Sequence, residues 1–278
     1  MGNKRTSSDK LWKVVGIAAI LSTTLLVAGF GYAVKDLVWP TPEQTQTAIK
    51  SPQAELPAKK PLSESNEIRI TAVGDSLTKG FGDDEGQGYV KQVVAMLKDK
   101  WGIPVRLNNN LAVNGLRADE LAESLLTNKG YQYTIQQANL ILFTIGGNDL
   151  FQSVTGEKAS EATGQFDLEK LKAGMPAGIK RFEAVIEQIH ALNPNAHVVY
   201  VGLFNPFYEV ADLRVGSTYI QQWNQQVYDI LHRYDNMTIV PTYDLFENAS
   251  SLYLSSDHFH PNHLGYEQIA TRIVQSLR

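Results

Sequence analysis

Two short stretches, far apart along the chain, contain the residue types that nucleophilic catalysis requires. They are residues 74–77 (GDSL) and residues 256–261 (SDHFHP). A serine hydroxyl attacks a carbonyl carbon when a base removes its proton, and histidine is the usual base near neutral pH. Asp257 precedes His260 by one helical turn, so its carboxylate can accept from the imidazole and orient it. Ser76, His260 and Asp257 are therefore the candidate nucleophile, base and orienting acid.

Two further positions offer hydrogen-bond donors for the oxyanion that such an attack creates. Asn148 follows the apolar run 140–145 and carries a side-chain amide. Gly115 follows the strand-like run 105–113, and no side chain shields its backbone N–H. Each residue alone also suits an ordinary turn. Their occurrence at successive strand ends favours an oxyanion hole formed by Ser76, Gly115 and Asn148.

A metal site is the alternative interpretation of the histidine-rich stretch. His258, His260, His263 and Asp257 are all possible ligands. No second ligand cluster accompanies them, and the chain has no cysteine, which excludes thiolate zinc ligands and disulfides. Pro261 fixes the backbone after His260 and favours that residue as the base. We expect His258 and His263 to face solvent or to cap a helix.

The elements that must position these residues alternate between strands and helices. Short runs, most of them apolar, predict strands at 68–73, 105–113, 140–145, 198–203 and 237–240. Periodic segments predict helices at 89–100, 118–126, 166–192, 218–234 and 263–277, the third broken by Gly174, Pro176 and Gly178. This alternation predicts an α/β domain, a three-layer α/β/α sandwich around a parallel sheet. Because active residues gather at the carboxyl ends of such strands, the candidate residues should converge there.

The N-terminal part of the chain predicts a membrane anchor and a tether. Residues 1–13 are basic, and residues 14–34 contain no charge over a length sufficient to span a bilayer. The basic flank predicts a cytoplasmic N-terminus and a domain outside the cell membrane. A cleaved signal peptide is the alternative, but the long apolar run without a clear cleavage site favours an uncleaved anchor. Residues 35–66 have five prolines and no glycine, which predicts an extended linker before a folded domain at 67–278.

Taken together, the motifs resemble the four ordered blocks of the SGNH (GDSL-type) hydrolase family. Each block is short, but their order and strand context are specific, and the resemblance covers about residues 68–277. The blocks stand at residues 74–77, 114–115 and 147–149 and at Asp257-x-x-His260-Pro261. The serine does not lie in a Gly-x-Ser-x-Gly elbow, so the larger α/β-hydrolase class is a poorer match.

The resemblance implies a role for each candidate residue. Ser76 would be the nucleophile, His260 the base and Asp257 its partner, with Gly115, Asn148 and the Ser76 N–H as oxyanion donors. It also implies a five-stranded, flavodoxin-like parallel sheet and ester hydrolysis through an acyl-enzyme. The family uses neither a metal nor an organic cofactor, so we expect no cofactor here.

Several ester substrates remain open at this point. Leu150, Phe151 and Val154 follow one predicted strand and residues 203–208 follow the next, where they would line an acyl site or simply pack under loops. An apolar lining near a membrane favours a lysophospholipid or another fatty-acyl ester. The alternatives are a carbohydrate O-acetylesterase acting on cell-wall or surface polysaccharide and a thioesterase.

A binding module without catalysis is the alternative from another functional class. Such a module on the outer membrane face would have no physical need for Ser76, Asn148, Asp257 and His260 together. The net charge of −4 provides no basic field for nucleic acid. We therefore expect an ester substrate and a membrane as partners and no nucleic acid, with the oligomeric state left open.

Overall fold

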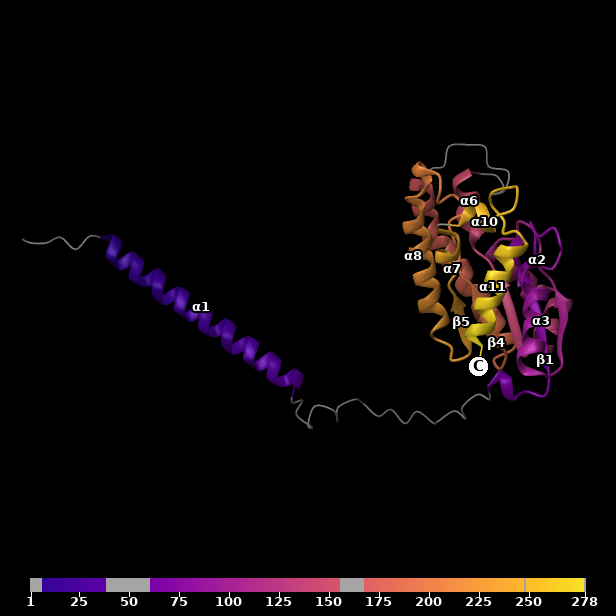
Figure 1. Cartoon of the computed structure of the whole chain (residues 1–278), viewed down its shortest axis with the longest axis horizontal. Coiled ribbons are helices and arrows are strands. Elements are labelled where there is room, and N and C mark those ends of the chain that lie inside the picture. Colours follow the sequence, from indigo (N-terminus) through magenta and orange to yellow (C-terminus); the bar gives the residue numbers. More distant parts are fainter. Residues whose placement is uncertain (1–6, 39–60, 156–167, 248, 278) are drawn as a thin grey trace, which may run out of the picture. The chain divides into compact units, whose positions relative to one another are not determined.

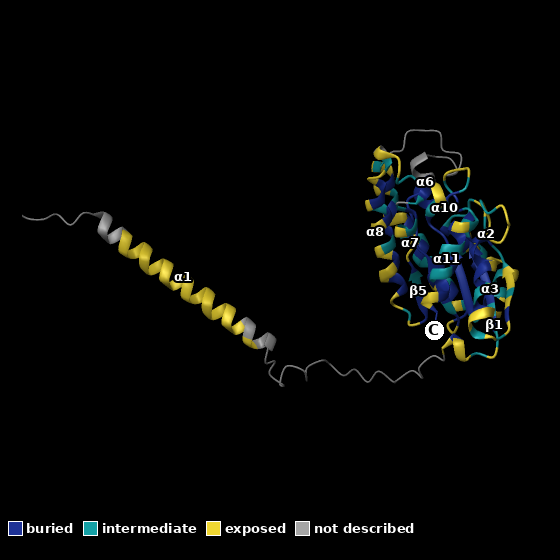
Figure 2. Cartoon of the chain, viewed as in Figure 1, coloured by how far each residue is buried: buried dark blue, intermediate teal, exposed yellow. Residues whose placement is uncertain are grey.

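The N-terminal segment and the remainder of the chain form two separate units, Met1–Ala58 and Lys59–Arg278. The computed structural model describes residues 7–38, 61–155, 168–247 and 249–277. In the first unit, helix α1 covers Ser7–Val38 (Figure 1). Its segment Trp12–Tyr32 is long and apolar enough to cross a membrane, as an anchor or a signal sequence would be, and is fully exposed (Figure 2). The predicted span 14–34 lies within α1, whereas residues 1–6 and most of the predicted linker, 39–60, lie outside the described residues.

Five strands of the second unit form one parallel sheet. The strands are β1 (Ile68–Gly74), β2 (Val105–Asn110), β3 (Leu140–Thr144), β4 (His197–Val201) and β5 (Met237–Val240). Their spatial order is β2-β1-β3-β4-β5, which is the flavodoxin-like order. The predicted five-stranded, three-layer α/β/α fold is therefore confirmed. The order reverses between β1 and β3, the position where such sheets bind ligands at their carboxyl ends.

Alternate side chains of β1, β3 and β4 enter two separate cores, one on each face of the sheet. In β3, Ile141 and Phe143 belong to one core, and Leu140 and Leu142 belong to the other. Figure 2 shows the sheet and the inner sides of the helices as buried. Both faces are therefore covered, as a parallel sheet requires.

The helices that cover these faces follow the strands along the chain. The first core contains residues of α4 (Ala118–Thr127), α5 (Lys129–Gln137), α7 (Leu168–Leu192) and α8 (Gly216–Leu231). The second core contains residues of α3 (Gly88–Trp101) and α11 (His263–Ser276), which pack side by side (Figure 1). Shorter helices are α2 (Ser76–Lys79), α6 (Gly147–Thr155), α9 (Tyr243–Glu247) and α10 (Ser250–Tyr253).

Helix α7 is continuous, so the break predicted at Gly174, Pro176 and Gly178 is wrong. Pro176 lies inside the helix. Gly178 lies where α7 meets α8, and a Cβ there would come within 2.9 Å of the Trp223 ring. The bare backbone at Gly178 lets the two helices pack around this buried ring, and this packing outweighs the local tendency to end the helix.

The core extends into the turn that precedes the first strand. Leu62, in the 3₁₀ turn Leu62–Glu64, is only 2% exposed and belongs to the same core as Ile68 and Leu277. Leu62 and Leu277 also line one shallow pocket with the first residues of β4 and β5. Leu62 therefore closes the core at the amino-terminal edge of the sheet.

Replacing Leu62 with alanine should lower the free energy of unfolding by about 2–4 kcal/mol, because the buried side chain leaves a cavity. The matched control is Glu64→Ala in the same turn, an exposed position where the change should stay within about 0.5 kcal/mol. Urea unfolding of the Lys59–Arg278 unit, followed by tryptophan fluorescence, measures both values. Equal stability of the two variants would show that Leu62 is not part of the core.

Candidate active site

Ser76 begins helix α2 directly after β1, and Gly74 and Asp75 shape this turn. Gly74 has φ 130°, and a Cβ there would lie 2.0 Å from the carbonyl oxygen of Thr144 on β3, so only glycine fits. Asp75 caps α2, because its carboxylate accepts the N–H of Leu77 at 3.1 Å. The same oxygen accepts the Thr144 hydroxyl at 2.6 Å. Ser76 is thereby held at the carboxyl edge of the sheet.

A chain of buried hydroxyl groups lies next to this turn. Thr144 Oγ1 is 2.7 Å from Thr78 Oγ1, which in turn is 2.7 Å from the Tyr89 hydroxyl. Burial raises the pKa of Asp75, and the hydrogen bond from Thr144 acts in the opposite direction. Nothing in the sequence pattern singles out Thr78, Thr144 and Tyr89, because their contacts appear only when three elements meet.

His260 lies within hydrogen-bonding distance of both Ser76 and Asp257, although 184 positions separate it from Ser76. His260 Nε2 is 2.8 Å from Ser76 Oγ, and His260 Nδ1 is 2.7 Å from Asp257 Oδ2. Since an ionised carboxylate only accepts, Nδ1 carries the hydrogen and Nε2 of the neutral ring accepts from the serine hydroxyl. Ser76 and His260 are 7% and 4% exposed. This arrangement can activate the hydroxyl for attack on a carbonyl carbon.

The other carboxylate oxygen of Asp257, Oδ1, accepts hydrogen bonds from residues of its own turn. Oδ1 accepts the Ser255 hydroxyl at 2.7 Å and the N–H groups of Phe259 and His260 at 2.9 Å each. Partial burial raises the pKa of this carboxyl, but the hydrogen bonds from His260, Ser255 and Phe259 outweigh it and lower the pKa to about 2. Asp257 is therefore ionised at neutral pH and orients the imidazole. Ser255 was not anticipated from the sequence.

His258 lies between Asp257 and His260 in the sequence but takes no part in the contact of His260 with Ser76. Its backbone φ is 56°, a left-handed conformation that non-glycine residues seldom adopt. Its N–H donates to the Ser255 carbonyl at 3.0 Å and closes the turn that brings Asp257 toward His260. The His258 side chain is exposed, as the sequence predicts, and contributes to a neighbouring pocket rather than to the contact with Ser76.

The structure offers no support for the metal interpretation of this stretch. His263 begins α11, where its ring pairs with Asp83 at 3.2 Å instead of joining His258 and His260. Within the described ranges of the chain, no group of three or more His, Asp or Glu residues could hold a metal ion.

Two phenylalanine rings flank His260. The ring centroids of Phe81 and Phe259 lie 4.7 Å and 4.9 Å from that of His260, both edge-on. Phe259 also contacts the rings of Phe151 and Phe207, at 5.7 Å and 5.9 Å. The aromatic contacts restrict the orientation of the imidazole and connect it to a wider apolar cluster.

Gly115 and Asn148 reach the same edge of the sheet. The Val113 N–H donates to the Gly74 carbonyl at 2.9 Å, which places the turn after β2 beside the end of β1. Gly115 lies in this turn with φ 76°. Asn148, in the first turn of α6, donates its side-chain amide to the carbonyl of Leu116 at 3.0 Å. An amide carries two N–H bonds, so this contact leaves the second for another acceptor.

An ion pair with a buried carboxylate supports this part of the site. The Asp149 side chain is fully buried and accepts Arg181 Nε at 2.7 Å and the Ala118 N–H at 2.9 Å. Burial raises the pKa of Asp149, while these two hydrogen bonds act against it. The pair connects α6 with α4 and α7 and so fixes the helix that carries Asn148. Asp149 belongs to the same sequence motif as Asn148, whereas no sequence pattern indicates a role for Arg181.

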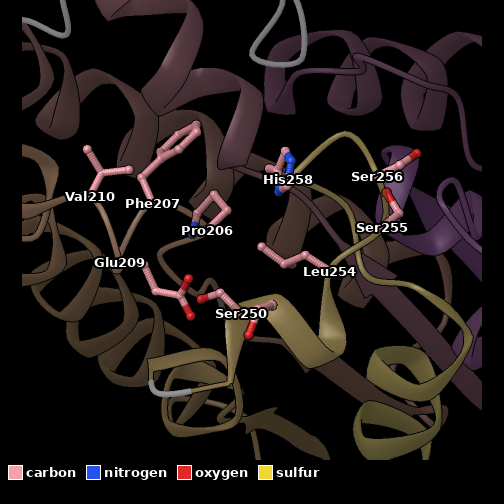
Figure 3. Close-up of a pocket in the computed structure, with 10 residues that line it drawn as sticks. Pro206, Phe207, Glu209, Val210, Ser250, Leu254, Ser255, Ser256 and His258 are labelled. Atoms are coloured by element: carbon pink, nitrogen blue, oxygen red, sulfur yellow. The ribbon is translucent and has the colours of Figure 1, made fainter.

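A pocket of about 610 Å³ is lined in part by Ser255, Ser256 and His258, the sequence neighbours of Asp257 (Figure 3). Figure 3 shows Pro206, Phe207, Glu209 and Val210 on one side, His258, Ser255 and Ser256 on the other, and Ser250 and Leu254 between them. Pro206 and Phe207, both in the segment expected to line an acyl site, form part of this wall. Leu150 and Phe151 are buried in the core instead, and the side chain of Val154 lies outside what the structure describes.

The family of the chain follows from its sequence match. Residues 72–268 match the sequence profile of the GDSL-like Lipase/Acylhydrolase family. The chain belongs to this family. Protein YpmR of Bacillus subtilis is 36% identical over 221 residues, which cover 76% of this chain and 82% of that protein. The spore germination lipase LipC of Bacillus licheniformis is 25% identical, over 74% of this chain and 94% of its own length.

Solved structures of a lipase and of an acetylxylan esterase share the fold. The lipase Lip_vut3 from a goat rumen metagenome aligns with a TM-score of 0.64 at 24% identity, covering 74% of this chain and 95% of that chain. An acetylxylan esterase from Geobacillus stearothermophilus aligns with a TM-score of 0.54 at 18% identity, covering 75% and 93%. The GDSL-like acylhydrolase is accordingly an ester-hydrolysing enzyme, as the sequence motifs predict.

Asp257→Asn should reduce the acid sensitivity of the fold. Folding lowers the pKa of Asp257 from 3.8 to about 2, so its ionised form stabilises the fold above about pH 4, and this contribution is lost as the pH falls through about 2. The difference in Tm between wild type and variant should therefore shrink over this interval. Thermal melts at several pH values measure it, with Asp99→Asn on the exposed side of α3 as control. A difference that stays constant down to about pH 2 would contradict the assignment.

Proposed function

We propose that Ser76 is the nucleophile of this acylhydrolase, His260 its general base and Asp257 the residue that orients and stabilises the imidazole. The observation that supports this is the continuous contact from Asp257 through the His260 ring to Ser76, with steps of 2.7 and 2.8 Å. Hydrolysis by these residues requires neither a metal nor an organic cofactor.

The proposed cycle has two halves. His260 Nε2 takes the proton of Ser76 as Oγ bonds to the ester carbon, and the N–H groups of Ser76 and Gly115 with the Asn148 amide stabilise the oxyanion. The C–O bond to the alcohol breaks, and the alcohol leaves with the proton from His260. Water then loses a proton to His260 and attacks the acyl-enzyme, the acid is released, and the proton returns to Ser76.

We infer that the preferred substrate is a lysophospholipid or another fatty-acyl ester. Four apolar side chains contribute to the adjacent pocket: Pro206, Phe207, Val210 and Leu254. The rings of Phe207, Phe259 and His260 form a continuous series from this pocket to the base. An acyl chain bound to Ser76 would therefore have an apolar route into the pocket. The relative LipC is named a lipase, which agrees with this inference.

We also propose that residues 14–34 anchor the enzyme in the cell membrane by a single pass. Four basic residues, Lys4, Arg5, Lys10 and Lys13, lie on the N-terminal side of the apolar run. By the positive-inside rule the N-terminus then lies in the cytoplasm and the hydrolase domain outside. An ester-containing lipid of the outer leaflet would lie within the reach of a tethered domain.

A carbohydrate O-acetylesterase is the second candidate, and the polar side of the same pocket favours it. Glu209, Ser251, Ser256 and His258 also line this space, and such groups hydrogen-bond the hydroxyls of a sugar. The fold itself accommodates acetyl-ester chemistry, as the acetylxylan esterase illustrates. The length of the acyl chain decides between the two candidates.

Ser76→Ala should lower the hydrolysis of p-nitrophenyl butyrate by at least about 1,000-fold, because no other group supplies the attacking oxygen. A fluorophosphonate should label the wild-type protein and not this variant. Ser63→Ala, an exposed serine outside the site, is the matched control and should behave as wild type. Hydrolysis that persists in Ser76→Ala would rule out Ser76 as the nucleophile.

The value of kcat/KM should rise at least about tenfold from acetyl to octanoyl p-nitrophenyl esters, since each CH₂ group buried in the pocket contributes up to about 0.8 kcal/mol. Phe207→Ala should reduce this preference while leaving acetyl ester hydrolysis within about twofold, because only longer chains would reach its ring. Steady-state kinetics with both esters, a lysophospholipid and an acetylated glycan measure the selectivity. Activity confined to the acetyl substrates would favour the carbohydrate candidate instead.

A further inference from the structure

Asp83 lies in the segment that follows the nucleophile helix α2, and four partners surround its carboxylate. Oδ1 accepts the N–H of Glu85 at 2.9 Å and faces His263 Nδ1 at 3.2 Å. Oδ2 accepts the N–H groups of Gln87 and Gly88 at 2.9 and 2.7 Å. Three partners belong to the segment of Asp83 itself, and the fourth is the first residue of α11.

The charge state of this carboxylate defines the direction of the hydrogen bonds. The Asp83 side chain is 0% exposed. Burial raises its pKa, but the N–H groups of Gly88, Glu85 and Gln87 and the ring of His263 lower it below the ordinary value. Asp83 is therefore ionised at neutral pH and accepts from all four partners, so His263 Nδ1 donates to it. The outer nitrogen of His263 faces Glu85, with Nε2 3.6 Å from Oε2.

The residues just before Asp83 pack directly against the candidate base. A Cβ on Gly82 would lie 2.8 Å from the His260 Cβ and 2.7 Å from the Pro261 carbonyl oxygen, so this approach requires glycine. The ring of Phe81 contacts the His260 ring edge-on at 4.7 Å. The carbonyl of Phe81 also accepts the hydroxyl of the buried Tyr266 of α11 at 2.7 Å.

We propose that Asp83 and His263 form a positioning pair that sets the distance between Ser76 and His260. Asp83 orders the segment that leaves the nucleophile, and His263 follows the loop that carries the base. Their hydrogen bond joins these two parts of the chain on the side of His260 where Gly82 and Phe81 pack. The proposal rests on the proposed roles of Ser76 and His260, and neither Asp83 nor His263 contacts the reacting atoms.

A purely structural role for Asp83 makes a different prediction. An aspartate that only stabilises its turn would affect the folded fraction and leave each folded molecule fully active. A positioning residue instead changes the rate of the chemical step, because misplacement by about 1 Å costs on the order of 100-fold. The reactivity of Ser76 in the folded enzyme separates the two roles.

The experiment compares Asp83→Asn, His263→Ala and the double variant in the full-length protein. For p-nitrophenyl butyrate, kcat per folded molecule should fall about 10–100-fold in each single variant, with KM within about twofold of wild type. The rate at which a fluorophosphonate labels Ser76 should fall by the same factor. Since the two residues act through one contact, the double variant should be no slower than the more impaired single variant.

Asp84→Asn is the matched control, the same substitution at the exposed neighbouring residue, and should retain wild-type kinetics. Unchanged kcat and labelling in folded Asp83→Asn or His263→Ala would overturn the proposal, as would losses that multiply in the double variant. If Asp83→Asn does not fold, His263→Ala alone decides by the same two readouts. Persistent activity of Ser76→Ala would instead refute the proposed function, so the two failures are distinguishable.

Discussion

The contact between Ser76 and His260 is the constraint on which the rest of the domain depends. It joins the end of the first strand to a loop near the end of the chain, and only the sheet order makes these segments neighbours. β1 is an inner strand, and α11 packs beside α3 on the face next to it. This packing places the loop before α11 at the carboxyl end of β1. Gly74 and Gly82, where any Cβ would collide with backbone, allow the close approach that this contact needs.

Three carboxylates near this contact differ in environment and therefore in what they can do. Asp75 and Asp149 are buried, their pKa is raised by burial, and their hydrogen bonds go to a turn, to a helix start and to Arg181. Asp257 is partly exposed and receives enough N–H and O–H donors to hold its pKa near 2. Asp75 and Asp149 are therefore buried carboxylates that stabilise the fold, and Asp257 is the one that stays ionised beside the imidazole.

Much of the fold could be predicted because strands and long helices leave periodic patterns in the sequence. The five strands are examples, and the motifs with Ser76, Gly115 and Asn148 follow β1, β2 and β3, whose carboxyl ends share one edge of the sheet. The pairing of Ser76 with His260 and Asp257 is expected from their residue types and from the family resemblance. The hydroxyl chain of Thr78, Thr144 and Tyr89 left no such pattern. Its members are ordinary residues until packing brings them together.

Other features could not be predicted because tertiary contacts override local tendencies. Helix α7 runs through Pro176, and two residues later Gly178 accommodates the Trp223 ring of α8, a contact that no local pattern indicates. Helix α6 begins at Gly147, in a stretch that reads as a turn. The flanking rings Phe81 and Phe259 and the Asp83–His263 contact depend on distances that no linear spacing encodes.

The position of Leu62 has a practical consequence. Leu62 and Leu277 meet at the amino-terminal edge of the sheet, so the chain enters and leaves the hydrolase domain on the same side. Ser76 lies at the end of β1 that points away from this side. An attachment to a support, or a graft into another protein, made at either end of the domain would therefore lie at the edge of the sheet opposite Ser76.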